Sequence, residues 1–597
     1  MPTYSAPVKD VTFLLNDVLE VQRHGNLPGF ADATPDMIDA IVSEGARFCE
    51  EVLAPLNAVG DREGCTRHDD GSVTTPTGFR DAYATYRDNG WIALSMPEAH
   101  GGQGLPSTLN TVIQEFMTGA NLAWSMYPGL SQGAAAALME HASEAQKALY
   151  LPKLASGAWS GTMNLTEPHC GTDLGQIKTK AVPNGDGSYK ISGQKIFISA
   201  GEHDLTENIV HLVLARIEGA PEGTKGISLF VVPKFLPDDN GEPGARNLVS
   251  CGSLEEKMGI HGNATCVMNY DEATGWLVGE ENRGLAAMFV MMNEARLAVG
   301  VQGLGQSEVA YQNAAAYAKE RLQGRSLSGA KYPDAKADPI LVHPDVRRTL
   351  LSIRAFNEAA RALVLWTALQ SDIAHRSDDE KAAQAADDHM GLMTPVIKGV
   401  LTDVGFDNTV AAQQMLGGHG YVEEWGMSQF VRDARIAMIY EGANGIQALD
   451  LVGRKLPKNG GRAVMAFFTE VGTFLKENGE NADLAPLLGP LKSGLDDLQG
   501  ATMWFMNNAM KAPDNAGAGS SDYMHLFGTV ALGYMWARMA KVARAKLAAG
   551  DEDTEFLETK LVLARHFMER HMPETALRRA RVEAGAETMM SLAAEAF

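Results

Sequence analysis

The spacing of hydrophobic residues changes twice along the 597-residue chain, and the order of these changes limits the possible folds. Residues 36–160 repeat apolar side chains at a spacing near 3.6, which predicts helices. Residues 161–280 carry short alternating runs between turn residues, which predicts strands. From residue 281 onward the helical spacing returns. A doubly wound sheet needs strands that alternate with helices, so this order excludes it.

A chain of this length is too long for one hydrophobic core, so we expect several domains. We predict an α+β multidomain protein with an N-terminal extension (1–35), an N-terminal helical domain (36–160), a middle β domain (161–280), a helical domain (281–456) and a C-terminal helical extension (457–597). The first long helix is predicted to have Thr34 as its cap and Pro35 in its first position.

Turn residues mark three further features. The segment "AVPNGDGSYKISGQKIFISAG" (181–201) has a turn signal between alternating runs and predicts a hairpin. The segment "LPDDNGEPGA" (236–245) predicts a long loop. After the break "PKNGGRA" (457–463) we expect about four amphipathic helices, interrupted by "KAPDNAGAGSSD" (511–522).

Composition narrows the classes of function. The net charge of −23 argues against a general binder of nucleic acid or anionic membranes. The five cysteines form no cluster with metal-ligand spacing, so we predict reduced thiols, no metal site and a cytoplasmic protein. The start lacks the pattern of a signal peptide, and the most apolar stretch (526–537) is too short to span a bilayer.

Two matches to hydrolase motifs fall in the first helical region. The segment Gly129–Gly133 fits GxSxG around Ser131, and His100–Gly104 resembles an oxyanion-hole loop. A nucleophile elbow needs a strand-to-helix turn in an open sheet. We therefore interpret Gly129–Gly133 as a connector between helices, with a serine hydrolase at Ser131 as the alternative. His419 in "GGHG" has no ligand partner at metal spacing and is interpreted as a turn residue.

Two other segments suggest chemistry. The segment "MNLTEPHCGTDLGQIKTKA" (163–181) combines hydroxyl residues with a Glu-Pro turn, which could hold a flat polar ring or a phosphate, or be an ordinary capped turn. In "RDARIAMIYEGANGIQ" (432–447) the apolar run 436–440 is followed by Glu441. This carboxylate is either a helix start signal or a base deprived of water, whose proton affinity would be raised.

Four ordered segments resemble the signatures of FAD-dependent acyl-CoA dehydrogenases. They are "LTEPHCGTD", "GQKIFISAG", "QQMLGGHGYVEEW" and "RDARIAMIYEGANGIQ". The resemblance covers about residues 36–455, and the lead-in and C-terminal region resemble the longer branch of the family. It implies an N-terminal helical domain, a middle β-barrel-like domain, a helical bundle domain and an extra C-terminal helical domain.

The resemblance also implies an FAD site. The positions that match cofactor contacts in the family are Met163, Leu165, Thr166, Gly171, Thr172, Phe197, Ser199, Arg321, Gln323, Gln414, Gly417, Gly418 and Asn444. Phe197 and Ser199 stand where the family usually has tryptophan and threonine, so an aromatic plane and a hydroxyl are kept.

Some of these positions serve a neighbouring subunit in the family. Arg321 and Gln323 match residues that reach the FAD of the neighbour, although the usual RxTFG is only partly kept. Gln414, Gly417 and Gly418 match contacts to the adenosine side of the partner's FAD. The resemblance therefore implies a homodimer or a higher homo-oligomer.

For the substrate, the matching positions are Thr172, Arg296, Tyr440 and Gly442, and the resemblance implies that Glu441 is the catalytic base. In the family this acid removes the α-proton while the β-hydrogen leaves as hydride to flavin N5. Hydrogen bonds from the backbone N–H of the glutamate and a ribityl hydroxyl stabilise the enolate.

Two departures from the family pattern concern this chemistry. Some relatives carry the base immediately before Arg296, where this chain has Ala295. Neighbouring Glu294 is one residue away, about 100° around a helix, and is a poor substitute. "EGANG" also replaces the commoner "EGTSQ", so Asn444 and backbone groups are the candidates to compensate.

We expect a flavoenzyme that introduces a trans-2,3 double bond into an acyl-CoA, with an electron-transfer flavoprotein as electron acceptor. Within the family, the chain is most similar to members of dimethylsulfoniopropionate breakdown that convert 3-(methylthio)propanoyl-CoA to 3-(methylthio)acryloyl-CoA. A straight-chain acyl-CoA dehydrogenase and an acyl-CoA oxidase are the near alternatives. A serine hydrolase or a helical binding protein would lack a flavin absorbance band.

Overall fold

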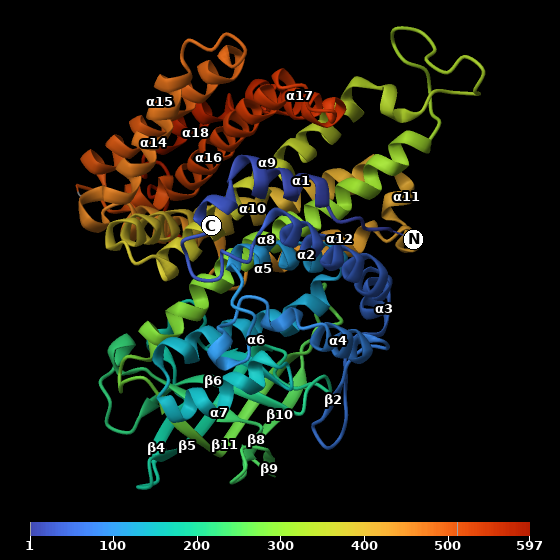
Figure 1. Ribbon diagram of the computed structural model, residues 1–597. Coiled ribbons are helices and arrows are strands. Elements are labelled where there is room, and N and C mark those ends of the chain that lie inside the picture. Colours follow the sequence, from blue (N-terminus) through green and yellow to red (C-terminus); the bar gives the residue numbers. More distant parts are fainter. Residues whose placement is uncertain (1, 510) are drawn as a thin grey trace. The chain divides into compact units, whose positions relative to one another are not determined.

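The computed structural model describes residues 2–509 and 511–597 (Figure 1). The chain divides into two compact units. One, here called the β-containing unit, comprises Glu44–Ala298; the other, the helical unit, combines Met1–Ser43 with Val299–Phe597. The finer domain boundaries expected from the sequence stay a prediction.

The sheet of the β-containing unit closes on itself. Its ring consists of β4 (Lys180–Pro183), β5 (Ser188–Ser199), β11 (Thr265–Val278), β7 (Ser228–Pro233) and β6 (Asn208–Ile217), each paired with the next, and β6 pairs back with β4. Two further strands are β10 (Val249–Leu254), which pairs with β11, and β3 (Trp159–Asn164), which lies parallel to β6. The predicted β-barrel-like middle domain is confirmed.

Strand β7 shows how the alternation of side chains builds two cores. Phe230 and Val232 face the cluster inside the barrel, whereas Leu229 and Val231 face a second cluster. That second cluster includes Ala134 and other residues of the helices before the sheet. Both faces of the strand are buried, so its sequence is a continuous apolar run.

Five described α-helices that lie wholly in this unit precede the sheet in the chain (Figure 1). They are α3 (Ala54–Glu63), α4 (Phe79–Asp88), α5 (Ser107–Ala120), α6 (Leu122–His141) and α7 (Glu144–Ala155). A small hairpin of β1 (Thr66–Arg67) and β2 (Val73–Thr74) joins the first two. The capping prediction is confirmed where the two units divide, since α2 (Pro35–Phe48) begins at Pro35 and Thr34 Oγ1 accepts from the Met37 N–H.

Two predictions for this unit are wrong. The expected connector at Gly129–Gly133 lies inside α6, where buried Ser131 donates to the carbonyl oxygen of Tyr127 in the preceding turn. The expected loop at residues 236–245 contains most of a hairpin, formed by β8 (Phe235–Pro237) and β9 (Pro243–Arg246). Asp238 fixes its turn by accepting backbone hydrogen bonds from Asn240 and Glu242. The hairpin predicted at β4–β5 is confirmed.

The helical unit is built around long helices. After α1 (Val8–Phe13), it contains α8 (Gly284–Glu320, from Val299 onward), α9 (Pro344–Arg376), α10 (Glu380–Met415), α11 (Gly418–Tyr421), α12 (Met427–Arg435) and α13 (Asn444–Asp450). Among the described residues, no helix in either unit combines the length and hydrophobicity needed to cross a membrane.

The C-terminal region has five described helices rather than about four. They are α14 (Arg462–Asn478), α15 (Ala485–Asn508), α16 (Asp514–Ala548), α17 (Thr554–Arg570) and α18 (Glu574–Glu583). The interruption predicted at 511–522 is therefore mostly helix. Small residues there permit close packing, since a Cβ on Gly519 would lie 2.9 Å from the ring of Phe505.

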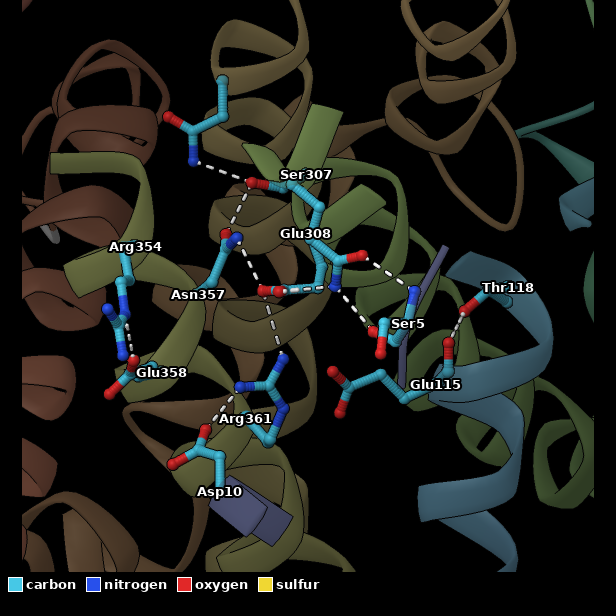
Figure 2. A network of polar contacts seen from close by, with 12 residues as sticks. Ser5, Asp10, Glu115, Thr118, Ser307, Glu308, Arg354, Asn357, Glu358 and Arg361 are labelled. Carbon is cyan, nitrogen blue, oxygen red and sulfur yellow. Dashed lines mark hydrogen bonds and ion pairs between the residues drawn. The ribbon is translucent and has the colours of Figure 1, made fainter. Parts of the chain in front are cut away.

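A buried network of charges joins the N-terminal segment to the rest of the helical unit (Figure 2). Asp10 pairs with Arg361 of α9 and with Lys560 of α17. Arg361 also contacts Glu308 of α8 at 3.3 Å, and Lys560 contacts Glu358 of α9 at 2.6 Å. Burial raises the pKa of Asp10, but the two cations outweigh it and the net pKa is lowered. Charges of both signs therefore compensate one another in a buried site.

Candidate active site

The first part of the candidate site is the turn that follows β3. Glu167 and Cys170 exchange two backbone hydrogen bonds of 3.0 Å, which closes the turn. The Glu167 carboxylate accepts hydrogen bonds from the N–H of Lys178 and from Thr179. It also pairs with the ammonium of Lys195 on β5 at 2.8 Å. The turn is thus fixed to the barrel by a buried ion pair.

Sequence reasoning missed Glu167 and Lys195. The Lys195 ammonium also donates to the Leu165 carbonyl oxygen at 3.0 Å, so it fixes the backbone before the turn. Burial lowers the pKa of Lys195, and Glu167 opposes that shift. A signal was present: Lys195 has the same parity as buried Ile191 in the β5 alternation, and a charged residue on the inward face calls for a buried partner.

A group with metal-ligand chemistry lies in the same turn. Ligand atoms of Glu167, His169 and Cys170 lie within 4.8 Å of one another. His169 Nε2 lies 2.9 Å from the carbonyl oxygen of Gln176, so this nitrogen carries a proton and donates. Burial raises the pKa of the Cys170 thiol, which keeps it protonated. These protonated forms of His169 and Cys170 suit a hydrogen-bonded turn. The predicted absence of a metal stays a prediction.

The second part is a β-bulge at Phe197. The pairing of β5 with β11 shifts between Ile198↔Cys266 and Lys195↔Met268, which leaves Ile196 and Phe197 opposite one residue. Phe197 has φ of +58°, and 59% of its surface is exposed. A non-glycine residue in this conformation costs about 1–3 kcal/mol, and such strain is concentrated at functional sites.

The bulge and the turn are adjacent. The Ile196 N–H donates to the carbonyl oxygen of Thr166 at 2.9 Å. Among the described residues, none accepts a hydrogen bond from the N–H or hydroxyl of Thr166, and none pairs with the hydroxyl of Ser199. Two hydroxyls and an amide beside an exposed aromatic ring suit a flat ligand with polar edges. These residues therefore fit the isoalloxazine ring of FAD.

The remaining predicted residues of this unit take varied positions. Met163 and Leu165 are partly buried against the cluster between the sheet and its helices. Gly171 and Thr172 are exposed after the turn, whereas Arg296 is buried in α8. Beside Arg296, Ala295 lies in the same helix, and the side chain of Glu294 lies outside the described residues.

In the helical unit, Glu441 lies in a short loop with a left-handed backbone. Its φ is +55°, and that of Gly442 is +85°. The following helix α13 begins at Asn444 with Ala443 as its N-cap, and no side chain caps it. The interpretation of Glu441 as a helix start signal is therefore wrong. Glu441 is a half-buried carboxylate on a strained loop.

Two side chains that sequence reasoning missed hold this loop by its backbone. Lys398 of α10 is fully buried, and its ammonium donates to the Gly442 carbonyl oxygen at 2.9 Å. Gln447 donates to the carbonyl oxygens of Glu441 and Gly442 at 3.2 and 3.1 Å. The signal for Lys398 was its position inside the apolar run "TPVIKGVL" of a predicted buried helix.

The side chain of Asn444 joins the loop to α10. Its carbonyl oxygen accepts from the Lys398 ammonium at 2.7 Å. Its NH₂ group donates to Asp403 Oδ1 at 2.6 Å, to Thr402 Oγ1 at 2.9 Å and to the Gly399 carbonyl oxygen at 3.2 Å. The predicted contact of Asn444 with the cofactor stays a prediction, and the structure gives this residue a role in positioning the loop.

Tyr440 is anchored just before Glu441. Its hydroxyl donates to the side-chain oxygen of Gln302 on α8. Burial, with the nearby Glu441 carboxylate, raises the pKa of Tyr440, so the hydroxyl remains a donor. Tyr440, Glu441, Gly442 and Asn444 are therefore brought together on one anchored segment.

Arg321 and Gln323 lie on the long loop between α8 and α9, which extends beyond the ends of these helices (Figure 1). Both residues are exposed. The Gln323 N–H donates to the Asp338 carbonyl oxygen, and the Ile340 N–H donates to that of Arg321. The buried Asp338 carboxylate accepts from the backbone of Ser326, Lys331 and Tyr332 in the same loop, so the loop is ordered around one acid.

Gln414, Gly417 and Gly418 are exposed at the end of α10. Gly417 has φ of +58°, which favours glycine at this turn. Their predicted contacts with a partner subunit stay a prediction.

The matches to known families cover nearly the whole chain. Residues 36–158, 162–273 and 282–456 match the N-terminal, middle and C-terminal domains of acyl-CoA dehydrogenases. Residues 467–593 match the domain described as acetyl-CoA dehydrogenase C-terminal like. The chain therefore belongs to the acyl-CoA dehydrogenase family, in the branch with an extra C-terminal domain.

Two relatives are similar over their full length. The chain is 42% identical to 3-methylmercaptopropionyl-CoA dehydrogenase of Ruegeria pomeroyi, over 99% of this chain and 99% of that protein. It is 36% identical to the broad-specificity linear acyl-CoA dehydrogenase FadE5 of Mycobacterium tuberculosis, over 100% of both. In fold it resembles an acyl-CoA dehydrogenase from Bacillus anthracis complexed with FAD (TM-score 0.73, 22% identity, 92% of this chain and 88% of that one).

The family resemblance inferred from the four motifs is confirmed. The chain is an FAD-dependent acyl-CoA dehydrogenase, an oxidoreductase that acts on an acyl-CoA. The alternatives of a serine hydrolase at Ser131 and of a helical binding protein are wrong.

Proposed function

We propose that Glu441 is the catalytic base and that the preferred substrate is 3-(methylthio)propanoyl-CoA. The observation that carries the first part is the anchored loop. Glu441 has a strained left-handed backbone, and buried Lys398 and Gln447 hold the carbonyl oxygens of this loop. Strain of about 1–3 kcal/mol persists only where surrounding contacts impose it, and it is concentrated at functional sites.

In the proposed reaction, the Glu441 carboxylate takes the proton from the α-carbon. The electron pair of that C–H bond forms the double bond as the β-hydrogen leaves with its own pair. FAD supplies the acceptor for this hydride when it is bound. The backbone N–H of Glu441 donates to the thioester oxygen, where negative charge develops, and thereby makes the α-proton acidic enough to remove.

Residues of the β-containing unit are proposed to hold the cofactor. Thr166 and Ser199 donate to polar edges of the ring, and Phe197 packs against it. Met163, Leu165, Gly171 and Thr172 complete this surface. Arg296, Thr172, Tyr440 and Gly442 are proposed to bind the CoA thioester, with Asn444 acting through the loop.

The substrate proposal rests on the 42% identity to 3-methylmercaptopropionyl-CoA dehydrogenase along the full chain. A straight-chain acyl-CoA is the second candidate, because a broad-specificity linear enzyme is 36% identical over the same length. A panel of CoA thioesters, each added anaerobically, separates the two by the rate of flavin bleaching. The proposal fails if butanoyl-CoA bleaches the flavin with a higher kcat/KM than 3-(methylthio)propanoyl-CoA.

We further propose an electron-transfer flavoprotein as electron acceptor and a homodimer or higher homo-oligomer as the working form. Exposed Arg321, Gln323, Gln414, Gly417 and Gly418 support the second point, since they are available for a partner subunit. Reoxidation by the flavoprotein rather than by oxygen separates a dehydrogenase from an oxidase.

The role of Glu441 is tested with Glu441→Gln. We expect this variant to keep FAD and bind substrate, and to lose flavin reduction by at least a thousand-fold. Glu380→Gln is the control, because it removes the same charge from an exposed glutamate at the start of α10. Wild-type bleaching in Glu441→Gln would mean that the base lies elsewhere.

A further inference from the structure

The extra C-terminal region packs against the helix that holds the loop of Glu441. Its helix α16 contacts both α10 and α13 within the helical unit. Two glycines make this approach close. A Cβ on Gly399 would lie 2.3 Å from the sulfur of Met524, and a Cβ on Gly528 would lie 2.7 Å from Val400. Gly399 directly follows Lys398, so α16 packs against the turn of α10 that holds the loop of Glu441.

A chain of hydrogen bonds crosses this contact. His525 of α16 lies with Nε2 2.9 Å from Asp403 Oδ2. The other oxygen, Asp403 Oδ1, accepts from the Asn444 NH₂ group at 2.6 Å. Asp403 is therefore shared between the C-terminal region and the loop. The side chains of His525 and Asp403 are only 16% and 25% exposed, so water does not readily replace either partner.

We propose that His525 is a positioning residue for the dehydrogenase reaction. It orients the Asp403 carboxylate, which orients Asn444, and Asn444 with Lys398 sets the backbone of Glu441 and Gly442. The inference rests on the proposed role of Glu441. It assigns the extra C-terminal domain a part in catalysis as well as in structure.

The physical reason is the strain in the loop. The left-handed conformation of Glu441 is unfavourable by itself and needs contacts that over-determine it. Without His525, the Asp403 carboxylate loses a donor and is free to rotate away from Asn444. The loop then samples relaxed conformations in which the carboxylate of Glu441 is misplaced, and small misplacements cost large factors in rate.

Two substitutions at His525 separate the hydrogen bond from the packing. His525→Leu removes the donor at similar volume, and His525→Gln keeps an N–H donor at the end of the side chain. His566→Leu is the matched control. His566 is also a histidine of the C-terminal region, and its Nε2 contacts Ser352 of α9 at 3.0 Å, but it does not reach the loop.

The measurement is anaerobic stopped-flow reduction of the holoenzyme by saturating 3-(methylthio)propanoyl-CoA and by butanoyl-CoA. We expect His525→Leu to reduce the flavin at least ten-fold more slowly, with unchanged FAD content and KM. The rate for His525→Gln should stay within three-fold of the wild-type rate, and the rate for His566→Leu should equal the wild-type rate. A wild-type rate in His525→Leu would overturn the proposal, as would an equal loss in His525→Gln and His525→Leu.

The route through Asn444 is tested by a double-variant cycle. If His525 acts through Asn444, adding His525→Leu to Asn444→Ala slows flavin reduction by less than a further two-fold. A full ten-fold additional loss would contradict this route. Failure of the base assignment is distinguishable, because it is read from Glu441→Gln alone. Should His525→Leu fold poorly, Asp403→Asn in the otherwise intact chain gives the same rate comparison.

Discussion

The buried ammonium of Lys398 donates a 2.9 Å hydrogen bond to the carbonyl oxygen of Gly442, the residue that follows Glu441. The contact fixes the backbone of the loop and does not involve the Glu441 carboxylate. In the proposed reaction, positioning and proton transfer are thus assigned to different residues, and each can be changed separately.

The first prediction concerns this contact. Lys398→Met keeps most of the length of the side chain but leaves the Gly442 carbonyl oxygen and the Asn444 side chain without their charged donor. We expect the free energy of unfolding to fall by about 1–3 kcal/mol and flavin reduction to slow at least ten-fold. Urea unfolding and anaerobic stopped-flow reduction measure the two effects. Lys381→Met, on the exposed start of α10, should change neither; a normal rate in Lys398→Met would contradict the anchoring role.

The ion pair between Lys195 and Glu167 supports the cofactor turn. Lys195→Met leaves a buried carboxylate uncompensated, so we expect a loss of about 3–5 kcal/mol in stability and a loss of bound FAD. The double variant with Glu167→Gln should be less destabilised than Lys195→Met alone. Lys190→Met, on the same strand as Lys195, is the control, since it breaks an exposed pair with Glu272 of β11 and should cost less than about 1 kcal/mol. Equal losses in the two lysine variants would refute the argument.

The strain at Phe197 is testable by comparing two small residues. Both Phe197→Ala and Phe197→Gly remove the exposed ring, so both should bind FAD more weakly. In the apoprotein, Phe197→Gly should be more stable than Phe197→Ala by about 0.5–1 kcal/mol, because glycine adopts positive φ without strain. Thermal unfolding of the two apoproteins measures this difference. An alanine variant at least as stable as the glycine variant would mean that the bulge is not strained.

Two buried histidines predict a pH dependence. His203 Nε2 lies 3.0 Å from Ser160 Oγ, and His211 Nδ1 lies 2.7 Å from Thr162 Oγ1. Burial lowers the pKa of each histidine to about 3 from the ordinary value of 6.5. The folded state then binds fewer protons than the unfolded state. Their stabilising contribution is therefore complete above about pH 6.5 and is lost as the pH falls toward 3.

We expect the free energy of unfolding to fall by about 2 kcal/mol per histidine between pH 7.5 and pH 5.0. Urea unfolding at the two pH values measures it. His211→Asn should reduce this pH-dependent loss by about 2 kcal/mol, while His68→Asn, at an exposed position, should leave it unchanged. A wild-type slope in His211→Asn would show that this histidine is not held neutral.

The loop that carries Arg321 and Gln323 depends on Asp338. Burial raises the pKa of Asp338, but hydrogen bonds from Ser326, Tyr332 and Lys331 outweigh it and lower the pKa to about 2. The stabilising effect of the charged form is thus present above about pH 3.8 and is lost as the pH falls through about 2. At neutral pH, Asp338→Asn should open the loop.

Limited trypsin digestion at pH 8 reports on this opening. We expect faster cleavage within residues 321–343 in Asp338→Asn than in wild type. Asp334→Asn changes an exposed acid of the same loop and should leave the rate unchanged. Equal cleavage of both variants would mean that Asp338 does not order the loop.

The secondary-structure elements that were predicted correctly are those set by the local spacing of hydrophobic residues. Period-two alternation located β5 and β6, and the change back to a helical period located α8. The run at 511–522 was misjudged because its small residues favour a break locally, whereas packing of Gly519 against Phe505 makes them helical. Close tertiary contact outweighed the local signal.

The sequence named candidate site residues but not their backbone conformation. Motifs marked Phe197 and Glu441, but not the left-handed backbone of either. That conformation depends on residues distant in the chain, such as Lys398, which is 44 positions from Gly442. The partners Lys195 and Glu167 are 28 positions apart. Such pairings are set by the fold and leave only indirect traces in the sequence.

The ion pair of Asp10 with Lys560 has a consequence for biosynthesis. These partners are 550 residues apart, so a ribosome that adds about 5–20 residues per second incorporates Lys560 about half a minute or longer after Asp10. The continuous span Glu44–Ala298 can fold meanwhile as a separate body. Until Lys560 has been made, Asp10 has Arg361 as its cationic partner but lacks the second one, so the charge compensation around the N-terminal segment is completed only near the end of synthesis.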